Sequence, residues 1–240
     1  MMKKILILTM NDLKNIIREP MLIFILVGPL LLSFGMHWFL PAVSAYAAPY
    51  FDLSRYYSLI VAFILLMTSM LMGMITGFLL LDERDDQVYM TLIVTPLGTE
   101  GYMMYRIAFP VIISFLYALI TLPLVGLMKI SFAPLLPIAI MSGLEAPIIA
   151  LFLAGFAANK VEGLALSKGL GLFMIPPIAA YFIQSNWRLL AGVSPFYWPV
   201  HAFLAIGNSS GTYWIHILVG IFVHGWLLYG LVHLFKKRMR

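Results

Sequence analysis

Six long apolar runs alternate with short polar segments along the chain. They cover residues 21–40, 56–81, 107–128, 135–158, 170–183 and 213–235. A helix that crosses a membrane needs roughly 20 apolar residues, and most of these runs reach that length. The runs lack the residue-by-residue alternation of barrel strands, which are also shorter. The pattern therefore predicts an all-α integral membrane protein with six transmembrane helices.

A further helix is predicted before the first run, over residues 5–19. Asparagine and lysine side chains occupy one face, and apolar positions recur at helical spacing on the other: Leu6, Met10, Leu13 and Ile17. Pro20 ends or bends this helix. An amphipathic helix of this kind lies in the membrane interface, either as a simple anchor or as an elbow that also contacts another subunit.

The basic residues gather at one end of the predicted helices. Of the 15 Lys and Arg residues, only Arg55, Lys129 and Arg188 fall at the other end. The positive-inside rule then places both termini in the cytoplasm and predicts a multi-pass protein of the cell membrane. Neither a cleavable signal peptide nor a dividing linker is evident, so residues 1–240 are expected to form one transmembrane domain.

The composition excludes several classes of protein. The chain has 62% hydrophobic and 10% charged residues, whereas a soluble domain has about 25% charged residues. Such a chain cannot cover its apolar surface in water, and it is too apolar to be disordered. The absence of cysteine excludes disulfides, thiolate metal sites and cysteine nucleophiles. The net charge of +5 follows from the membrane orientation and does not indicate a nucleic-acid partner.

The connection over residues 82–106 is the longest one at the basic end. It opens with the charged run Asp82-Glu83-Arg84-Asp85-Asp86 and continues with an apolar stretch, residues 88–94. The sequence Thr95-Pro96-Leu97-Gly98 ends this stretch. An apolar patch exposed on a surface usually marks an interaction site. The alternative is that residues 88–94 simply lie on the lipid surface.

Two motifs in this connection resemble those of exporter-type (type 2) ABC transporter permeases in their small six-span half-transporter form. They are Asp82-Glu83-Arg84 and Val94-Thr95-Pro96-Leu97. The resemblance implies a permease subunit that forms a homodimer or heterodimer and moves a substrate outward. It also implies that the connection forms a coupling helix. This helix would dock on a separate ATPase subunit through the following residues: Asp86, Val88, Tyr89, Thr91, Leu92, Val94, Pro96 and Leu97.

No ATP site is predicted on this chain, because no Gly-Lys pair is followed by Ser or Thr as a P-loop requires. The resemblance therefore assigns ATP, Mg²⁺ and ATP hydrolysis to the partner ATPase. It leaves this chain as a transport subunit without catalytic, cofactor-binding or metal-binding residues. A channel or secondary carrier without an ATPase is the alternative, although carriers usually show a repeat and several buried charges. The expected substrate is an amphipathic drug or peptide.

Glu145 is the only formally charged residue inside the six runs. An ionisable group inside a membrane is costly and is a candidate for function, and Met70 and Met74 offer adaptable apolar contacts. These three residues are predicted to line a substrate path. The alternative is that a neutral Glu145 satisfies backbone groups freed by a nearby proline. Gly73 and Gly77 permit close approach of helices and are predicted to pack two permeases together.

One class of enzyme, the rhomboid type of intramembrane serine protease, shares the six-helix plan. Ser142 and His224 fall in the spans that such an enzyme requires, but Ile140 occupies the first glycine position of Gly-x-Ser-Gly. The two residues also lie at different depths, so the pair would need adjustment to reach hydrogen-bond distance. His216 and His233 are eight and nine residues from His224 and do not converge with it on a metal.

Overall fold

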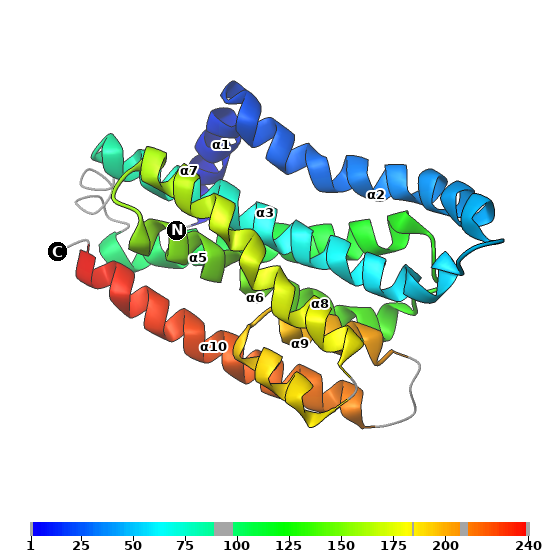
Figure 1. The fold of residues 1–240 in the computed structure, drawn as a ribbon. Helices are drawn as coiled ribbons and strands as arrows, with labels where there is room; N and C mark the ends of the chain where they lie inside the picture. The colour runs from blue at the N-terminus through cyan, green and yellow to red at the C-terminus, as the bar shows by residue number, and fades with distance from the viewer. Residues whose placement is uncertain (1, 89–97, 184, 207–210, 239–240) are drawn as a thin grey trace.

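The computed structural model describes residues 2–88, 98–183, 185–206 and 211–238, and every regular element in these ranges is helical (Figure 1). The long helices are α1 (Met2–Arg18), α2 (Pro20–Ala47), α3 (Tyr57–Asp85), α5 (Gly98–Val125), α6 (Phe132–Phe156) and α10 (Thr212–Arg238). The shorter elements are η1 (Leu53–Tyr56), α7 (Lys160–Gly169), η2 (Leu170–Met174), α8 (Ile175–Phe182), η3 (Asn186–Val193) and α9 (Tyr197–Leu204). The prediction of an all-α fold is confirmed.

Within the described ranges, six helical segments are apolar and long enough to cross a membrane, as predicted. The third and fifth differ most from their predicted bounds. α5 begins at Gly98, well before residue 107, because the charge of Arg106 is paired inside the bundle. The fifth segment runs through α7, η2 and α8, so the predicted span of residues 170–183 was too short.

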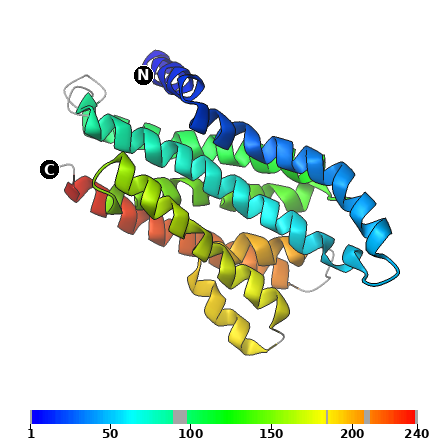
Figure 2. The same cartoon turned by 45° about the horizontal axis from the view of Figure 1, so that its top comes forward.

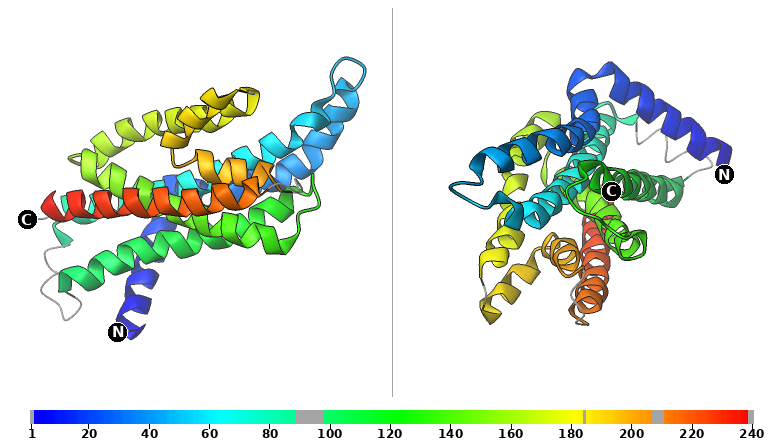
Figure 3. Two further views of the ribbon diagram at one scale, coloured as in Figure 1. Left: turned by 90° about the horizontal axis from the view of Figure 1, so that it is seen from below. Right: turned by 90° about the vertical axis from the view of Figure 1, so that its right-hand side faces the viewer.

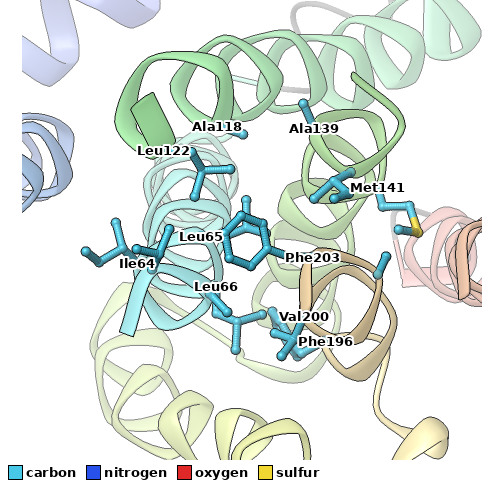
Figure 4. Close-up of a cluster of buried hydrophobic side chains, with 14 of the residues drawn as sticks. Ile64, Leu65, Leu66, Ala118, Leu122, Ala139, Met141, Phe196, Val200 and Phe203 are labelled. Atoms are coloured by element: carbon cyan, nitrogen blue, oxygen red, sulfur yellow. The ribbon is translucent and has the colours of Figure 1, made fainter. Parts of the chain in front are cut away.

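α3 and α6 form the centre of the bundle. They are the most buried of the six segments and pack along each other, while α2, α5 and α10 lie around them (Figure 2). The short helix α9 enters the bundle beside α10 and contacts α3 and α6. Figure 4 shows Phe203 of α9 pointing into the space between Leu65, Leu122 and Met141. Close packing of this kind is what holds helices together in a membrane, where lipid is as apolar as the side chains.

α1 lies across the bundle rather than along it (Figure 3). Met10, Leu13 and Ile17, which were predicted to be apolar interface positions, are exposed on its outer face. Asp12 and Ile16 are buried on the face that meets the bundle. The amphipathic helix predicted over residues 5–19 is thus confirmed, and its outward apolar face suits a membrane interface. The periodicity did not indicate the buried carboxylate.

Both chain termini lie at the same end of the bundle (Figure 1). The last turn of α3, the first turns of α5 and α7 and the last turn of α10 are found there too, joined by ion pairs. We call this the charged end, because it contains Asp82, Glu83, Arg106 and Lys160. The other end, where α2 ends and α10 begins, is called the opposite end.

Candidate functional site

Arg106 is the centre of a buried ion cluster at the charged end. Its guanidinium is 1% exposed and donates to Asp12 Oδ2 from Nη1 at 2.7 Å and to Asp12 Oδ1 from Nη2 at 3.2 Å. Nη2 also donates to Glu83. The Tyr105 hydroxyl donates to Asp12 Oδ2 at 2.6 Å, and the Tyr102 hydroxyl donates to Glu83 Oε2 at 2.6 Å. The Arg106 cluster, which comprises these five residues, therefore joins α1, α3 and α5.

The Arg106 cluster joins the two helices on either side of residues 86–98. α3 ends and α5 begins on either side of residues 86–98, so the contact between Arg106 and Glu83 fixes the spacing of the two points where that segment leaves and rejoins the bundle. Desolvation makes buried ions costly, and they are kept only where each has a partner. The two helices that flank the segment are thus tied to each other and to α1.

A second group of charges surrounds Lys160 at the start of α7. Its Nζ donates to Glu19 Oε2 at 2.8 Å and to Asp82 Oδ2 at 2.9 Å. Its backbone N–H donates to Asp85 Oδ2 at 3.0 Å. Glu19 lies between α1 and α2, so these bonds connect the start of α7 to the end of α3 and to the junction of the first two helices.

Arg84 closes the C-terminus of α6. Its Nη1 donates to the carbonyl oxygen of Ala154 at 3.0 Å, and Nη2 donates to that of Ala157 at 2.5 Å. A cation at this position also meets the negative end of the helix dipole. Together with Asp82, Glu83 and Asp85, this arginine makes four of the five residues in the charged run into attachments between helices.

Asp86 and Val88 are the predicted docking residues that fall within the described part of the chain. Both are exposed beyond the end of α3. Gln87 between them has a φ of 55°, in the left-handed region, so the chain leaves the line of α3 there. The remaining predicted docking residues lie outside the described residues: Tyr89, Thr91, Leu92, Val94, Pro96 and Leu97.

Glu145 of α6 lies in the interior of the bundle with no exposed surface. Ser69 of α3 donates to Glu145 Oε2, and Nε2 of His224 in α10 lies 3.9 Å from Glu145 Oε1. Three helices therefore meet at one polar group. The alternative pairing of Ser142 with His224 is wrong, because His224 faces Glu145 and Ser142 Oγ has no hydrogen-bond partner among the described residues.

The predicted path residues Met70 and Met74 are partly buried against the central core cluster. Glu145 is enclosed between α3, α6 and α10 in this conformation. A substrate would reach Glu145 only after these helices separate. The role of the three residues in a substrate path stays a prediction.

Gly73 and Gly77 pack α3 on α6 within one chain. A Cβ atom added at Gly73 would lie 2.5 Å from the carbonyl oxygen of Ala146 and 2.7 Å from Ile149 Cβ. One added at Gly77 would lie 2.9 Å from Leu153 Cδ1. The prediction that these glycines pack two permeases together is corrected: the close approach is real, but its partner is α6 of the same chain.

Histidine and aromatic side chains gather where α9 meets α10, near the opposite end. The rings of His201 and Tyr197 are stacked with centroids 4.1 Å apart, and the centroids of His201 and His216 are 5.8 Å apart. Burial, followed by the neighbouring His216, lowers the pKa of His201 to about 4. In the part of the chain that the structure describes, no three His, Asp or Glu side chains are grouped so that they could hold a metal ion.

An apolar cavity of about 480 Å³ lies between α6, η2, η3 and α10. Its lining includes Phe152, Phe173 and Phe196, and the rings of Phe152 and Phe173 meet edge to face with centroids 5.7 Å apart. Ligand pockets for drug-sized molecules occupy about 300–1,000 Å³ and are mostly apolar and aromatic. The cavity has the size and lining for a flat apolar molecule.

Sequence reasoning missed Asp12, Tyr102 and Tyr105. Asp12 did carry a signal, since it is the only acidic residue before Glu19 in a segment that is otherwise apolar, polar or basic. Arg106 was counted only as one of the basic residues that set the orientation. The sequence signal for the ion pair between Asp12 and Arg106 was therefore an isolated carboxylate in the first segment and an arginine next to an apolar run.

Comparison with known proteins places the chain in a family. Residues 12–232 match the model of the family described as Fluoroquinolones export permease protein Rv2686c-like. The chain belongs to this family. It is similar to the Fluoroquinolones export permease proteins MT2760 and Rv2686c of Mycobacterium tuberculosis, from strains CDC 1551 / Oshkosh and ATCC 25618 / H37Rv respectively.

Each of these relatives is 32% identical to this chain over 215 residues, which cover 88% of this chain and 85% of the relative. No solved structure matches the chain. Membership of the Rv2686c-like family, together with six apolar helices, shows that the chain is a multi-pass membrane protein and the permease subunit of an exporter. The resemblance to exporter permeases is confirmed.

Proposed function

We propose that this permease is driven by a separate cytoplasmic ATPase and works as a pair with a second permease. The observation that carries the proposal is the contact between Arg106 and Glu83, which ties together the two helices flanking residues 86–98. A segment that merely lay on lipid would not need its two attachment points fixed by buried ions and linked to α1. A segment that receives force from a partner would need fixed attachment points and a connection to the rest of the bundle.

The charged end is cytoplasmic in this proposal, because it holds most of the basic residues. ATP and Mg²⁺ bind to the partner, and movement of the partner displaces residues 86–98. The Arg106 cluster passes the displacement to α1, α3 and α5 together, and the bundle switches between inward-facing and outward-facing forms. Each part of this chain acts by position and packing, since the chemistry belongs to the ATPase.

The proposed substrates are flat amphipathic aromatic drugs of the fluoroquinolone class. The names of the two relatives support this class. The apolar cavity with its phenylalanine lining supports it independently, because aromatic rings favour stacked or edge-to-face contact with a flat ring system.

The docking step is tested by placing a charge on the segment. We expect Leu92→Asp and Val94→Asp to leave insertion and yield near normal, since neither residue falls in one of the six apolar runs of the sequence. Co-purification with the ATPase encoded in the same cells should fall at least tenfold, and fluoroquinolone export should fall with it. Tyr50→Asp is the control, because Tyr50 is 89% exposed at the opposite end. Retention of both the ATPase and export by the two docking variants would overturn the proposal.

A further inference from the structure

Glu145 and His224 meet inside the bundle without completing a hydrogen bond. Both side chains have no exposed surface, and the nearest distance between them, from Glu145 Oε1 to His224 Nε2, is 3.9 Å. Neither of these two atoms has another hydrogen-bond partner among the described residues. Two unpartnered polar atoms that face each other in a membrane interior are costly unless a proton lies between them.

The other atoms of the two side chains determine how many protons the pair holds. His224 Nδ1 lies 2.6 Å from the carbonyl oxygen of Gly220, and a carbonyl oxygen only accepts, so Nδ1 carries a hydrogen. Nε2 is then either a bare acceptor or the second N–H of a charged imidazolium. Glu145 Oε2 is already bonded to the hydroxyl of Ser69. The pair is without net charge when it holds one proton: a neutral acid then faces a neutral ring, or a carboxylate faces an imidazolium.

A pair with one proton is neutral overall, whichever atom holds it. Removing the proton would leave a buried carboxylate opposite a lone pair, and adding one would leave a buried imidazolium opposite an O–H group. Each change creates a net charge with no counter-ion in a medium of low dielectric constant. The neutral pair with one proton is therefore the favoured state of the enclosed site.

Among the residues that the structure describes, the elements packed around the pair bring no other ionisable group to it. His216 and His233 of α10 are eight and nine residues from His224, about 12–14 Å along the helix axis. On α9, His201 and Tyr197 contact His216 instead. On α3, Glu83 lies 14 residues from Ser69, about 21 Å along the axis, and is bonded to Arg106 of α5.

The remaining titratable side chain in the middle of α5 is directed elsewhere. The Tyr117 hydroxyl donates to the carbonyl oxygen of Leu26 in α2 at 3.0 Å. α5 presents Ser114 to α6 at this level, and its hydroxyl donates to the carbonyl oxygen of Ser142. Glu145 and His224 therefore hold their proton as a pair.

We propose that Glu145 and His224 form a single-proton binding site inside the membrane, and that separation of α10 from α6 releases this proton. Water that enters between the helices would hydrate the two side chains individually. The site stands apart from the ATPase, so it does not depend on the proposed function and is tested on the permease alone.

The direction of the pH effect follows from counting protons in the two states. The closed pair binds one proton. Hydrated Glu and His have ordinary pKa values of about 4.3 and about 6.5, so the separated pair binds none above pH 6.5, one between these values and two below pH 4.3. Separation thus releases one proton above about pH 6.5, and its equilibrium constant rises up to tenfold for each pH unit.

The absence of cysteine makes the distance between the helices measurable with spin labels at two introduced cysteines. Ile140→Cys in α6 and Phe222→Cys in α10 suit this purpose, because Ile140 and Phe222 are 47% and 74% exposed and close in sequence to the pair. The full-length permease in lipid nanodiscs would be measured by electron–electron double resonance from about pH 3.5 to about pH 9, so that both expected onsets fall inside the range. We expect the population at the longer distance to grow with pH, up to tenfold for each unit.

Variants of Glu145 and His224 test whether the pH dependence of the helix distance comes from the proton that these two residues hold. Glu145→Gln/His224→Gln keeps polar groups of similar size but has no proton to release, so the distance distribution should not change with pH. His201 and His216 remain in this variant, so it is compared with the parent chain above about pH 6.5, where a histidine with an ordinary or lowered pKa is neutral. His233→Gln is the matched control, since His233 is exposed on the same helix, and it should behave like the parent chain.

If the double variant does not fold, the single variant His224→Gln tests the proposal instead. In His224→Gln the carboxyl group alone carries the proton, so the onset of the pH dependence should move from about pH 6.5 to about pH 4.3. A distance distribution in the parent chain that does not change with pH would overturn the proposal. So would a double variant with the pH dependence of the parent, or an unchanged onset in His224→Gln.

Discussion

Arg106 of α5 donates hydrogen bonds to both carboxylate oxygens of Asp12 in α1, which lies 94 residues away in the chain. The same guanidinium bonds to Glu83 near the end of α3. An amphipathic helix at the surface is thereby attached to the two helices that flank residues 86–98. Pulling any one of these three helices away would leave an unpaired ion in the bundle interior.

The cost of breaking the Arg106 cluster should depend on which ion is removed. Arg106→Gln leaves the carboxylates of Asp12 and Glu83 close together without a cation, so we expect a loss of about 3–5 kcal/mol of stability. Asp12→Asn leaves Arg106 paired with Glu83 and should cost less. Thermal unfolding of the purified permease in detergent gives this order directly.

An exposed ion pair at the same end supplies the control for the Arg106 variants. Lys236 donates to Glu100 at 2.7 Å, and their side chains are 35% and 84% exposed. Exposed pairs contribute about 0–1 kcal/mol, so Lys236→Gln should leave the unfolding temperature nearly unchanged. A loss for Lys236→Gln equal to that for Arg106→Gln would show that burial does not set the cost.

The spans could be predicted because a membrane-crossing helix is apolar along almost its whole length. The run over residues 56–81 corresponds closely to α3 for this reason. α7 was not predicted as part of the fifth span, since its sequence contains Lys160 and Glu162. Lys160 is accommodated by Asp82, 78 residues earlier, and a local pattern has no information on a partner so distant.

The partners of the candidate site residues were also too distant in the chain to be predicted from a local pattern. Glu145 could be identified from sequence because a charge inside an apolar run is rare. Its partners could not, because Ser69 and His224 lie on other helices, 76 residues before and 79 residues after Glu145 in the chain. The glycines of α3 predicted a close helix approach, but only the assembled bundle determines that α6 makes it.

The approach of α3 to α6 predicts a large effect of one methyl group. Gly73→Ala would place its Cβ 2.5 Å from the carbonyl oxygen of Ala146, so the helices would have to move apart. We expect a loss of about 1–3 kcal/mol, the usual cost of overpacking. The fraction folded as a function of temperature, measured in the same detergent as the parent chain, would show it.

Gly28→Ala is the matched control for this substitution. Gly28 lies inside α2, and nothing lies within 4 Å of an added Cβ there. Because alanine favours a helix over glycine by about 1 kcal/mol, this variant should be as stable as the parent or slightly more stable. A loss comparable to that of Gly73→Ala would mean that any alanine in a span is harmful, whatever it contacts.

The packing of α9 on α10 should weaken in acid through His201. Its pKa is about 4 in the folded protein, below the ordinary value of about 6.5. Between these values the unfolded chain binds more protons at this position than the folded one, so acidification favours unfolding. The stability contributed by the neutral ring is present above about pH 6.5 and is lost as the pH falls toward about 4.

His201→Phe tests this pH dependence while retaining an aromatic ring beside Tyr197. The unfolding temperature of the variant should fall less steeply than that of the parent between about pH 6.5 and about pH 4. Identical slopes for the two proteins would show that His201 remains neutral in the unfolded chain or is charged in the folded one.

Transport in a purified system is the most direct test of ATP-driven export by this permease. Proteoliposomes would contain either the permease alone or the permease with the ATPase that co-purifies with it, and uptake of a fluorescent fluoroquinolone would be followed with and without external ATP. We expect uptake only when the ATPase and ATP are both present, and we expect Leu92→Asp to abolish it. Uptake by the permease alone, driven by a pH gradient and unaffected by Leu92→Asp, would contradict an ATP-driven mechanism and identify a secondary carrier.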